Sequence, residues 1–460
     1  MSAPRHLLFS VDDTGESMDG HLALAVLSAD PTNRIYVGPH HCLMGLARRL
    51  KGGVYLGMGA RGDRRDQELE DYHLLKQRGF VVVHFDHQGA IYPGGERRWR
   101  SILQERLDPR QLDANDYVCT WGNFQRDVYR ELDPPCRQNI RTTGHPLFDL
   151  YERRWHSYYR SQTNRLRAKF GDFLLINTDL ARAHQGHGDD DGESPSPSMQ
   201  ARLHGIDAWA HENETLSHFV RLVHRLHMVF PELALVVRPH RREDPDFYRL
   251  VFQGLSSVHV LQDSPVAPWI LASQCVIHSG CVAGLGAHLG DAPTINFRPV
   301  QNPRQTLFLP DQCGVICDTI DHVVECLVAL FHRDQRRTPF DDPPLIDHRA
   351  KQLLHNLYDP CIPTLASVLD EAQRQVEHSA ALPRLALRTE HRLRDTLAGI
   401  RSVLGTFSPP NQGAARRLSS FDGFNATDVS KRIGRLEHLT GRSVDHHVLS
   451  PRLLVVESAR

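Results

Sequence analysis

The sequence predicts an α/β protein with two Rossmann-type, doubly wound lobes and a C-terminal helical extension. Over the first 165 residues, short apolar runs alternate with helical patterns, which is typical of a doubly wound sheet. A second alternating series begins near residue 173, after a charged, aromatic helical pattern at 151–169. After residue 318 the patterns become mostly helical. Because 460 residues are many for one core, we expect lobes at 1–165 and 166–330 and an extension at 331–460.

In the first lobe, each predicted strand is a short apolar run that ends in polar residues. The predicted strands are residues 6–11, 34–37, 53–56, 81–85, 116–120 and 139–142. The predicted helices between them are residues 19–29, 43–51, 66–78, 99–107 and 121–132. Parallel strands need such helical crossovers, so this order predicts a parallel sheet.

The second lobe repeats the alternation. Its predicted strands are residues 173–176, 234–237, 258–261, 275–277, 294–297 and 314–315, with a helix at 214–229. Later helices are predicted at 323–332, 349–356, 365–378, 388–404 and 428–439, followed by an apolar tail at 453–456. The segment HQGHGDDDGESPSPS at 184–198 predicts a mobile loop. Its histidines and aspartates could chelate a cation, but a flexible acidic loop is the favoured interpretation.

Composition excludes several classes of protein. The formal net charge is −1, from 54 Lys and Arg against 55 Asp and Glu, so no basic field indicates nucleic-acid binding. The nine cysteines form no CxxC pair or zinc-type quartet, which favours a reducing compartment and gives no ligand set for a metal. The apolar run at 7–9 is short and is soon followed by Asp12 and Asp13, whereas a signal peptide has a longer apolar segment. We expect a cytoplasmic protein, with a peripheral contact at the inner membrane left open.

Two strand ends of the second lobe carry the residues that best predict a binding site. Arg238 and His240 follow the strand at 234–237, and His278, Ser279 and Gly280 follow the strand at 275–277. Ligands of open α/β sheets bind beyond the carboxyl ends of strands. A guanidinium, an imidazole and a glycine turn before a helix together suit a phosphate. Simple turn and helix caps are the alternative interpretation.

Further polar residues end other strands. Asn177 and Thr178 follow the first strand of the second lobe and could hydrogen-bond a phosphate or sugar, or simply cap the next segment. In the first lobe, Asp86 and His87 follow the fourth strand and Asp12 the first. A carboxylate at such a strand end can serve as a base or nucleophile, and capping is about as compatible with the local sequence.

A competing motif follows the third strand. Residues Gly57 to Gly62 read GMGARG and match GxGxxG, with Asp86 at the end of the next strand. This pattern would fit a dinucleotide-dependent oxidoreductase. Two observations argue against this interpretation. The fingerprint normally lies on the first βα turn, whereas this motif follows the third strand, and a charged segment, RGDRRD, follows it.

With these residues placed, the chain resembles a bacterial family of surface carbohydrate biosynthesis proteins. That family is related to the retaining β-Kdo transferases, which use CMP-Kdo and adopt the two-lobed GT-B fold. The resemblance rests on seven ordered segments: residues 53–56, 79–82 leading to Asp86, 120–122 with Gln125, 143–146 with Asp149, 175–178, 237–240 with Glu243, and 278–281 with Gly284 and Ala287.

The resemblance implies roles for the two lobes. The second lobe would hold CMP, with His240 and Arg238 at the phosphate, Ser279, Gly280 and Cys281 along the phosphate or ribose, and Asn177 and Thr178 on the cleft floor. The first lobe would hold the acceptor. The chain departs from the family pattern where Arg241 replaces a proline, His87-Gln88 replaces two glutamates and Gly286 replaces a glutamate.

The function predicted from the sequence is therefore a glycosyltransferase. It would move Kdo or a related sugar from a CMP donor, as substrate and not as cofactor, to a surface polysaccharide or lipid-linked glycan precursor. Asp86 would act as nucleophile or base, with His87 and Asp12 orienting the acceptor. Its partners would be the donor, a glycan or glycolipid acceptor and, left open, export machinery. A non-catalytic nucleotide- or glycan-binding relative is the alternative, followed by the oxidoreductase.

Overall fold

The computed structural model divides the chain into two compact units. Unit 1 comprises Met1–Gly89, Ile102–Leu150 and Leu354–Arg460, and unit 2 comprises Ala90–Ser101 and Tyr151–Leu353. The structure describes residues 4–11, 15–57, 65–87, 91–184, 199–262, 265–331, 339–341, 347–378, 421 and 423–459. In this division the residues Leu354–Arg460 belong to the same unit as the N-terminal residues.

Unit 1 is built on an eight-stranded sheet of order β13-β14-β2-β1-β3-β4-β5-β6. Its strands are β1 (Arg5–Ser10), β2 (Asn33–Gly38), β3 (Gly53–Gly57), β4 (Phe80–Phe85), β5 (Tyr117–Thr120), β6 (Ile140–Thr142), β13 (Val444–Ser450) and β14 (Leu453–Ser458). The six N-terminal strands are parallel and lie within about two residues of the predicted runs. β3 and β4 are buried throughout, as expected for parallel strands with helices on both faces.

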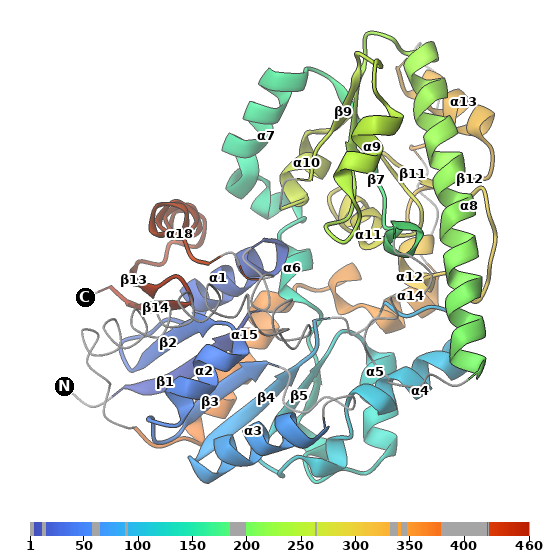
Figure 1. Cartoon of the computed structure of the whole chain (residues 1–460). Helices are drawn as coiled ribbons and strands as arrows, with labels where there is room; N and C mark the ends of the chain where they lie inside the picture. The colour runs from blue at the N-terminus through green and yellow to red at the C-terminus, as the bar shows by residue number, and fades with distance from the viewer. Residues whose placement is uncertain are drawn as a thin grey trace, which may run out of the picture. The chain divides into compact units, whose positions relative to one another are not determined.

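The helices of unit 1 come from both ends of the chain (Figure 1). They are α1 (Glu16–Ser28), α2 (His40–Ala47), α3 (Arg65–Gln77), α5 (Asn123–Glu131), α6 (Pro146–Asp149), α15 (Cys361–Arg374) and α18 (Ala426–Thr440), with α4 (Glu96–Arg106) beginning in unit 2. Asp149 accepts hydrogen bonds from the amides of Cys361 and Ile362 at 2.7 and 2.6 Å. This buried carboxylate caps α15 and attaches the C-terminal part of the chain to the N-terminal part.

The C-terminal segment contains strands as well as the expected helices. The apolar tail at 453–456 forms most of β14, which pairs antiparallel with β2 through Val456 and Ile35. In Figure 1 the red strand β14 lies beside the blue strand β2. An ion pair between Arg34 and Glu457 at 2.7 Å supports the pairing. The predicted helix at 388–404 lies outside the described residues.

Unit 2 has a six-stranded, fully parallel sheet of order β12-β11-β10-β7-β8-β9. Its strands are β7 (Phe173–Asn177), β8 (Ala234–Arg238), β9 (Val258–Val260), β10 (Cys275–His278), β11 (Thr294–Phe297) and β12 (Val315–Cys317). Its helices are α7 (His156–Phe170), α8 (Met199–Val229), α9 (Pro245–Val251), α10 (Ala267–Ala272), α11 (Val282–Leu289), α12 (Phe308–Asp311), α13 (Ile320–Phe331) and α14 (His348–Leu353).

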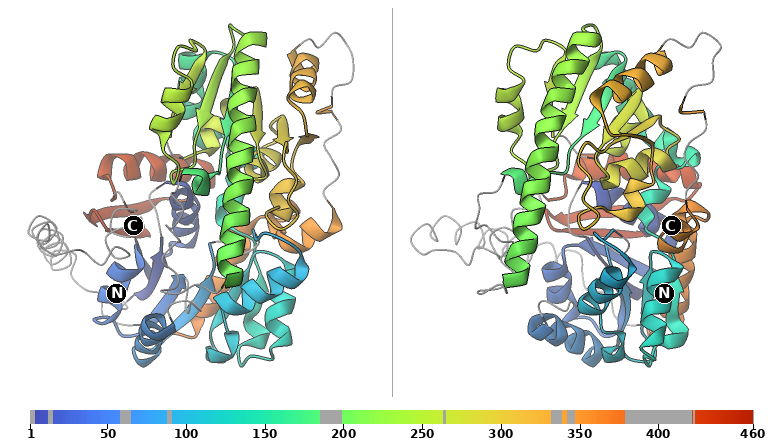
Figure 2. Two further views of the ribbon diagram at one scale, coloured as in Figure 1. Left: turned by 45° about the vertical axis from the view of Figure 1, so that its right-hand side comes forward. Right: turned by 90° about the vertical axis from the view of Figure 1, so that its right-hand side faces the viewer.

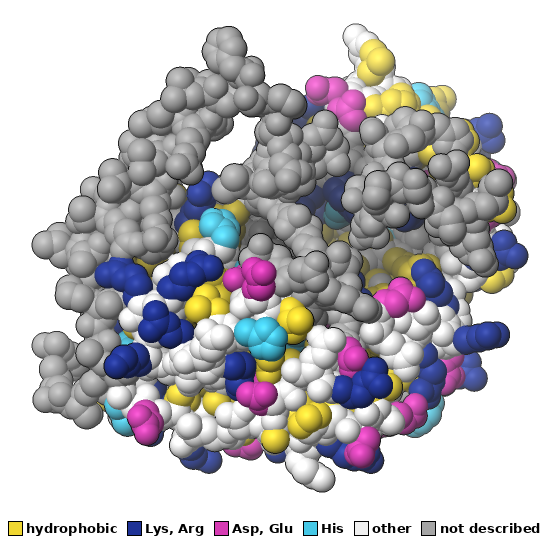
Figure 3. Space-filling view, turned by 60° about the horizontal axis from the view of Figure 1, so that its bottom comes forward, with side chains coloured by type: hydrophobic (Ala, Val, Ile, Leu, Met, Phe, Trp, Pro, Cys, Tyr) yellow, Lys and Arg dark blue, Asp and Glu magenta, His cyan; other side chains and the backbone are white. Residues whose placement is uncertain are grey.

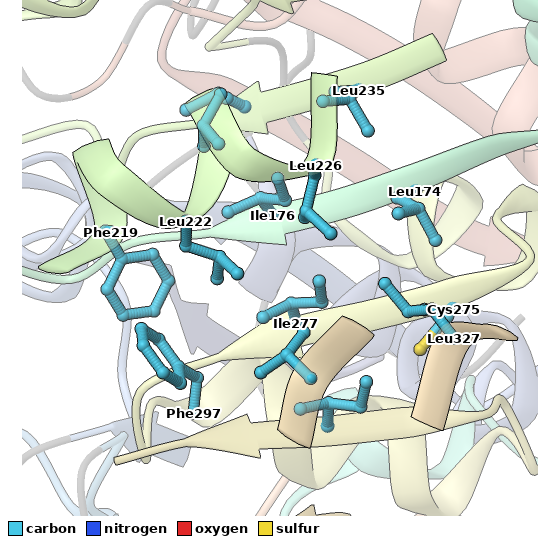
Figure 4. Close-up of a cluster of buried hydrophobic side chains, with 14 of the residues drawn as sticks. Leu174, Ile176, Phe219, Leu222, Leu226, Leu235, Cys275, Ile277, Phe297 and Leu327 are labelled. Atoms are coloured by element: carbon cyan, nitrogen blue, oxygen red, sulfur yellow. The ribbon is translucent and has the colours of Figure 1, made fainter. Parts of the chain in front are cut away.

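The core of unit 2 lies between this sheet and helices α8 and α13. Helix α8 contains 31 residues. Both views in Figure 2 show it as one unbroken helix. Its buried face, including Phe219, Leu222 and Leu226, meets Ile176 on β7 and Ile277 on β10 (Figure 4). Apolar residues at helical spacing on α8 and successive buried residues on β7 and β10 thus form one contiguous cluster.

The predicted α/β class with two Rossmann-type, doubly wound lobes is confirmed. Within the described ranges, no helix is both long and apolar enough to cross a bilayer. On the face shown in Figure 3, basic and acidic side chains are interspersed, as the near-zero net charge predicts.

Candidate functional site

The sheet of unit 2 has a topological switch point between β7 and β10. After β7 the chain builds β8 and β9 on one side, and it then returns to place β10 on the other side of β7. The connections that follow β7 and β10 therefore leave in opposite directions. In open parallel sheets, such a divergence leaves a crevice at the carboxyl ends of the two strands, and this is where their ligands bind.

Three of the predicted site residues end adjacent strands at this crevice. Asn177 on β7 is the register partner of Arg238 on β8, and His278 ends β10, which pairs with the other edge of β7. In the sequence, Asn177 lies about sixty residues from Arg238 and about a hundred residues from His278. Parallel pairing brings the three together, because parallel strands end at the same edge of the sheet. The structure places the predicted set of the second lobe on one edge.

The side chain of Asn177 is buried without a partner. It is 3% exposed, and neither its amide nitrogen nor its amide oxygen has a hydrogen bond within the described residues. A buried amide without hydrogen bonds costs free energy on the order of 1–3 kcal/mol. Such a cost at a strand end in a crevice is typical of a group that hydrogen-bonds a ligand or ordered water.

Thr178 next to it has a structural partner. Its hydroxyl donates to the two oxygens of Glu243 at 2.9 and 3.1 Å, and Tyr248 donates to Glu243 at 2.5 Å. The backbone amide of His240 donates to the same carboxylate at 2.9 Å. Burial raises the pKa of Glu243. Glu243 thereby joins the segments after β7 and β8, a role that the sequence pattern alone did not reveal.

His240 is held as a hydrogen-bond donor. Its Nδ1 accepts from the amide of Arg242 at 3.3 Å, so the proton of a neutral ring is on Nε2. Burial lowers the pKa of His240, with Asp179, whose carboxylate lies 3.9 Å from Nδ1, opposing this effect. A neutral, donating imidazole beside the end of β8 is suited to an uncharged hydrogen bond with a phosphate oxygen.

His278 is part of the scaffold of the glycine turn. It is completely buried, its Nδ1 accepts from the amide of Gly280 at 3.0 Å, and its Nε2 donates to the carbonyl of Cys313 at 3.0 Å. Both ring nitrogens are thus used within the protein. These two hydrogen bonds fix the glycine turn relative to the end of β10.

The turn itself places a left-handed glycine before the N-terminus of α11. Gly280 has φ of 75°, a left-handed conformation that favours glycine, and Cys281 is the N-cap residue of α11. Ser279, Gly280 and Cys281 therefore lie directly before the first backbone amides of α11, where the helix dipole favours negative charge. A Cβ atom on Gly284 would lie 2.2 Å from the His278 ring, so this helix approaches the strand end closely.

Gly286 is required by packing. A Cβ atom there would lie 2.6 Å from Cζ of Tyr151, which is 2% exposed. The aromatic ring occupies the volume that a side chain at 286 would need. The absence of a side chain at position 286 is therefore coupled to the presence of Tyr151.

In unit 1, the carboxylate of Asp86 is already paired. Arg106 donates from Nε and Nη2 to its two oxygens, both at 2.8 Å, and Asp86 is 3% exposed. Trp121 donates its indole N–H to the backbone carbonyl of Asp86 at 2.7 Å. These contacts fix the end of β4. Asp12, the other predicted carboxylate, lies outside the described residues.

His87 belongs to a cluster of three imidazoles. Its ring centroid lies 5.2 Å from that of His21 and 5.7 Å from that of His145. Burial, together with His87 and His21, lowers the pKa of His145 well below its usual value. The Nε2 atom of His145 and the Nδ1 atom of His87 have no hydrogen-bond partner among the described residues. Sequence reasoning assigned only His87, although His145 stands in the same kind of strand-end position.

Two sequence features fall on residues that the structure does not describe. These are residues 58–62 of the GxGxxG motif and residues 185–198 of the acidic, histidine-containing segment. Gly57 ends β3 beside β1, at the switch point of the unit 1 sheet.

Comparisons with known proteins give structural matches only. No family model and no curated protein sequence matches the chain. Among solved structures, UDP-GlcNAc 2-epimerase from Neisseria meningitidis bound to UDP-GlcNAc is similar with 9% identity and a TM-score of 0.46, over 81% of this chain and 100% of that one. The wall teichoic acid polymerase TagF is similar with 10% identity and a TM-score of 0.43, over 81% and 90% of the two chains.

UDP-N-acetylglucosamine 2-epimerase from Rickettsia bellii is similar with 11% identity and a TM-score of 0.42, over 81% of this chain and 98% of that one. At this level of similarity the matches assign no activity to the chain. Its fold class follows from its own two sheets.

Proposed function

We propose that unit 2 binds a nucleotide-activated sugar and that the protein is a glycosyltransferase acting on a CMP donor. The donor sugar would be Kdo or a related sugar, and the acceptor a surface glycan precursor. The observation that carries the proposal is the buried amide of Asn177 at the switch point between β7 and β10, which has no hydrogen-bond partner in the part of the chain that the structure describes. Arg238 ends the neighbouring strand, and the glycine turn before α11 follows the other neighbour.

Each group in this set has a role at a phosphate. The guanidinium of Arg238 supplies positive charge, Nε2 of His240 supplies a neutral donor, and the first amides of α11 supply further donors. Cleavage of the sugar–phosphate bond leaves negative charge on the CMP phosphate. Donors that are already oriented stabilise that charge without reorganisation, which is how such a set accelerates transfer. Asn177 and Thr178 would line the floor, with Asn177 making the direct contact.

Unit 1 would supply the acceptor site. His87 would orient the acceptor hydroxyl, with the neutral His145 beside it. The contacts of Asp86 favour a positioning role over that of nucleophile or base, because Arg106 binds both of its oxygens.

The same ion pair favours a second candidate function, a protein that binds the nucleotide without transferring the sugar. The expected carboxylate nucleophile is engaged in this structure. Such a protein would bind CMP with the same unit 2 residues and would not release CMP from CMP-Kdo.

Calorimetric titration with CMP, CDP, UDP and NAD tests the nucleotide site. We expect CMP to bind most tightly, and Asn177→Ala to weaken it about tenfold to a hundredfold, as for loss of a buried hydrogen bond to a charged group. Asn213→Ala is the matched control, because that amide donates within α8 to Trp209. Equal CMP affinity in all three proteins, or preferential binding of NAD, would contradict the proposal.

Release of CMP from CMP-Kdo then separates the two candidate functions. Turnover that falls in His240→Ala supports the transferase. Binding of CMP without turnover in the unmodified protein supports the non-catalytic alternative.

A further inference from the structure

Two cysteines and a histidine converge at the edge of unit 2, away from the crevice described above. Cys317 ends the edge strand β12, and His322 and Cys326 lie on α13. One ligand atom from each of the three residues lies within 4.8 Å of the other two. Sulfur and imidazole nitrogen are the ligands that zinc prefers.

The local fold explains why these side chains meet. His322 and Cys326 are four residues apart on one helix, so they share a face. Cys317 is separated from α13 only by a short turn, in which the hydroxyl of Thr319 accepts from the amide of His322 at 3.2 Å. In the ten-residue pattern C-x4-H-x3-C, the end of β12 therefore places the first cysteine. The turn at Thr319 and the helix α13 place the histidine and the second cysteine beside it.

The spacing of the two sulfur atoms fits a tetrahedral metal. With zinc–sulfur bonds of about 2.3 Å, tetrahedral geometry places two thiolates about 3.8 Å apart. The observed distance between the Sγ atoms of Cys317 and Cys326 is 3.9 Å. Disulfide-bonded sulfurs would lie about 2.05 Å apart.

The environment offers both an entry route and a favourable charge. His322 is exposed, whereas Cys317 and Cys326 are buried against the apolar cluster that includes Cys275 and Leu327 (Figure 4). The carboxylates of Asp318 and Glu325 act electrostatically on Cys317 and Cys326, respectively. An ion would enter past the histidine and leave one coordination position toward water.

We propose that Cys317, His322 and Cys326 bind a zinc ion, with water as the fourth ligand. The ion ties the edge strand β12 to α13, and its role is structural. This site is independent of the nucleotide crevice and of the function proposed for it.

Metal titration of the full-length protein, stripped of metal and kept reduced, tests the site. Zinc should bind with one ion per chain, and cobalt should give the thiolate-to-metal absorption that reports sulfur ligands. His322→Ala should weaken zinc binding by at least about tenfold. Even mutation of residues that only support the metal ligands lowers metal affinity on this scale. Cys326→Ser should abolish the cobalt absorption.

Two variants serve as controls. His348→Ala removes an exposed histidine of unit 2, and Cys119→Ala removes a buried cysteine of unit 1, and both should bind zinc normally. Circular dichroism confirms that each variant is folded, and His322→Ala keeps the test valid if a cysteine variant fails to fold, because His322 is exposed. Absence of zinc binding, or binding unchanged in His322→Ala, overturns the proposal.

Discussion

Thr178 donates its hydroxyl to Glu243 at 2.9 and 3.1 Å, which joins the chain after β7 to the turn after β8. The side chain of Glu243 is completely buried. The hydrogen bond from Thr178 therefore compensates part of the free-energy cost of removing this carboxylate from water. Asn177 and Arg238 flank this contact in the adjacent register pair. The Thr178–Glu243 contact therefore holds in place the strand ends on which the nucleotide proposal depends.

Thr178→Val should destabilise unit 2 by about 2 kcal/mol, because it removes a hydrogen bond to a buried charged group. Urea unfolding measures the loss, and calorimetry should show weaker CMP binding in parallel. Thr215→Val is the matched control, because that hydroxyl donates only to the carbonyl of His211 within α8. Equal losses in the two variants would show that Glu243 does not depend on Thr178.

Asp86→Asn should destabilise unit 1 by about 3 kcal/mol, because it removes the charge of one partner of a buried ion pair and leaves Arg106 without this counter-ion. CMP affinity should be unchanged, because the nucleotide residues belong to unit 2. Asp127→Asn, which breaks the exposed pair with Arg126, should change stability by no more than about 1 kcal/mol. Loss of CMP release from CMP-Kdo at full stability would instead assign Asp86 the nucleophilic role.

Gly286→Ala should destabilise unit 2 by about 1–3 kcal/mol through overpacking against Tyr151. Adding Tyr151→Leu should recover part of this loss, so that the two changes are non-additive in a double-mutant cycle. Gly434→Ala on α18 is the control of opposite sign, because no described residue outside α18 lies within 4 Å of the added methyl group and alanine favours helix over glycine by about 1 kcal/mol. Strict additivity of the first pair would refute the steric explanation.

The stability of unit 2 should fall between pH 7 and pH 5 because of His278. Burial lowers the pKa of His278 to about 4, while the unfolded chain titrates near its usual value of about 6.5. Between these values the unfolded state binds more protons, so the free energy of unfolding decreases as the pH falls. Between pH 7 and pH 5 this effect lowers the free energy of unfolding by about 2 kcal/mol.

Urea unfolding of His278→Gln at both pH values checks this expectation. The variant should start less stable at pH 7 and lose about 2 kcal/mol less than the unmodified protein on acidification. An identical pH dependence in both proteins would mean that His278 does not carry the effect. His145, whose pKa is also lowered, remains in both proteins and cancels in the comparison.

Much of the fold could be predicted from local patterns. The parallel strands of both sheets lie within about two residues of the predicted apolar runs, because a buried parallel strand needs an unbroken apolar sequence between polar turns. The tail at 453–456 was not recognised as a strand, since its partner β2 lies more than four hundred residues away. A short apolar run has no periodicity of its own that identifies a partner.

The sequence by itself determined the α/β class and the polar residues at the ends of the strands, because periodicity and strand-end polarity are encoded locally. Tertiary structure decided which of those residues have partners. The side chain of Asn177 has no hydrogen bond to any residue that the structure describes, whereas Asp86 pairs with Arg106 and His278 with Gly280 and Cys313. Hydrogen bonding and burial depend on neighbours that are distant in sequence, so the same strand-end position gives a ligand-binding group in one case and a scaffold in another.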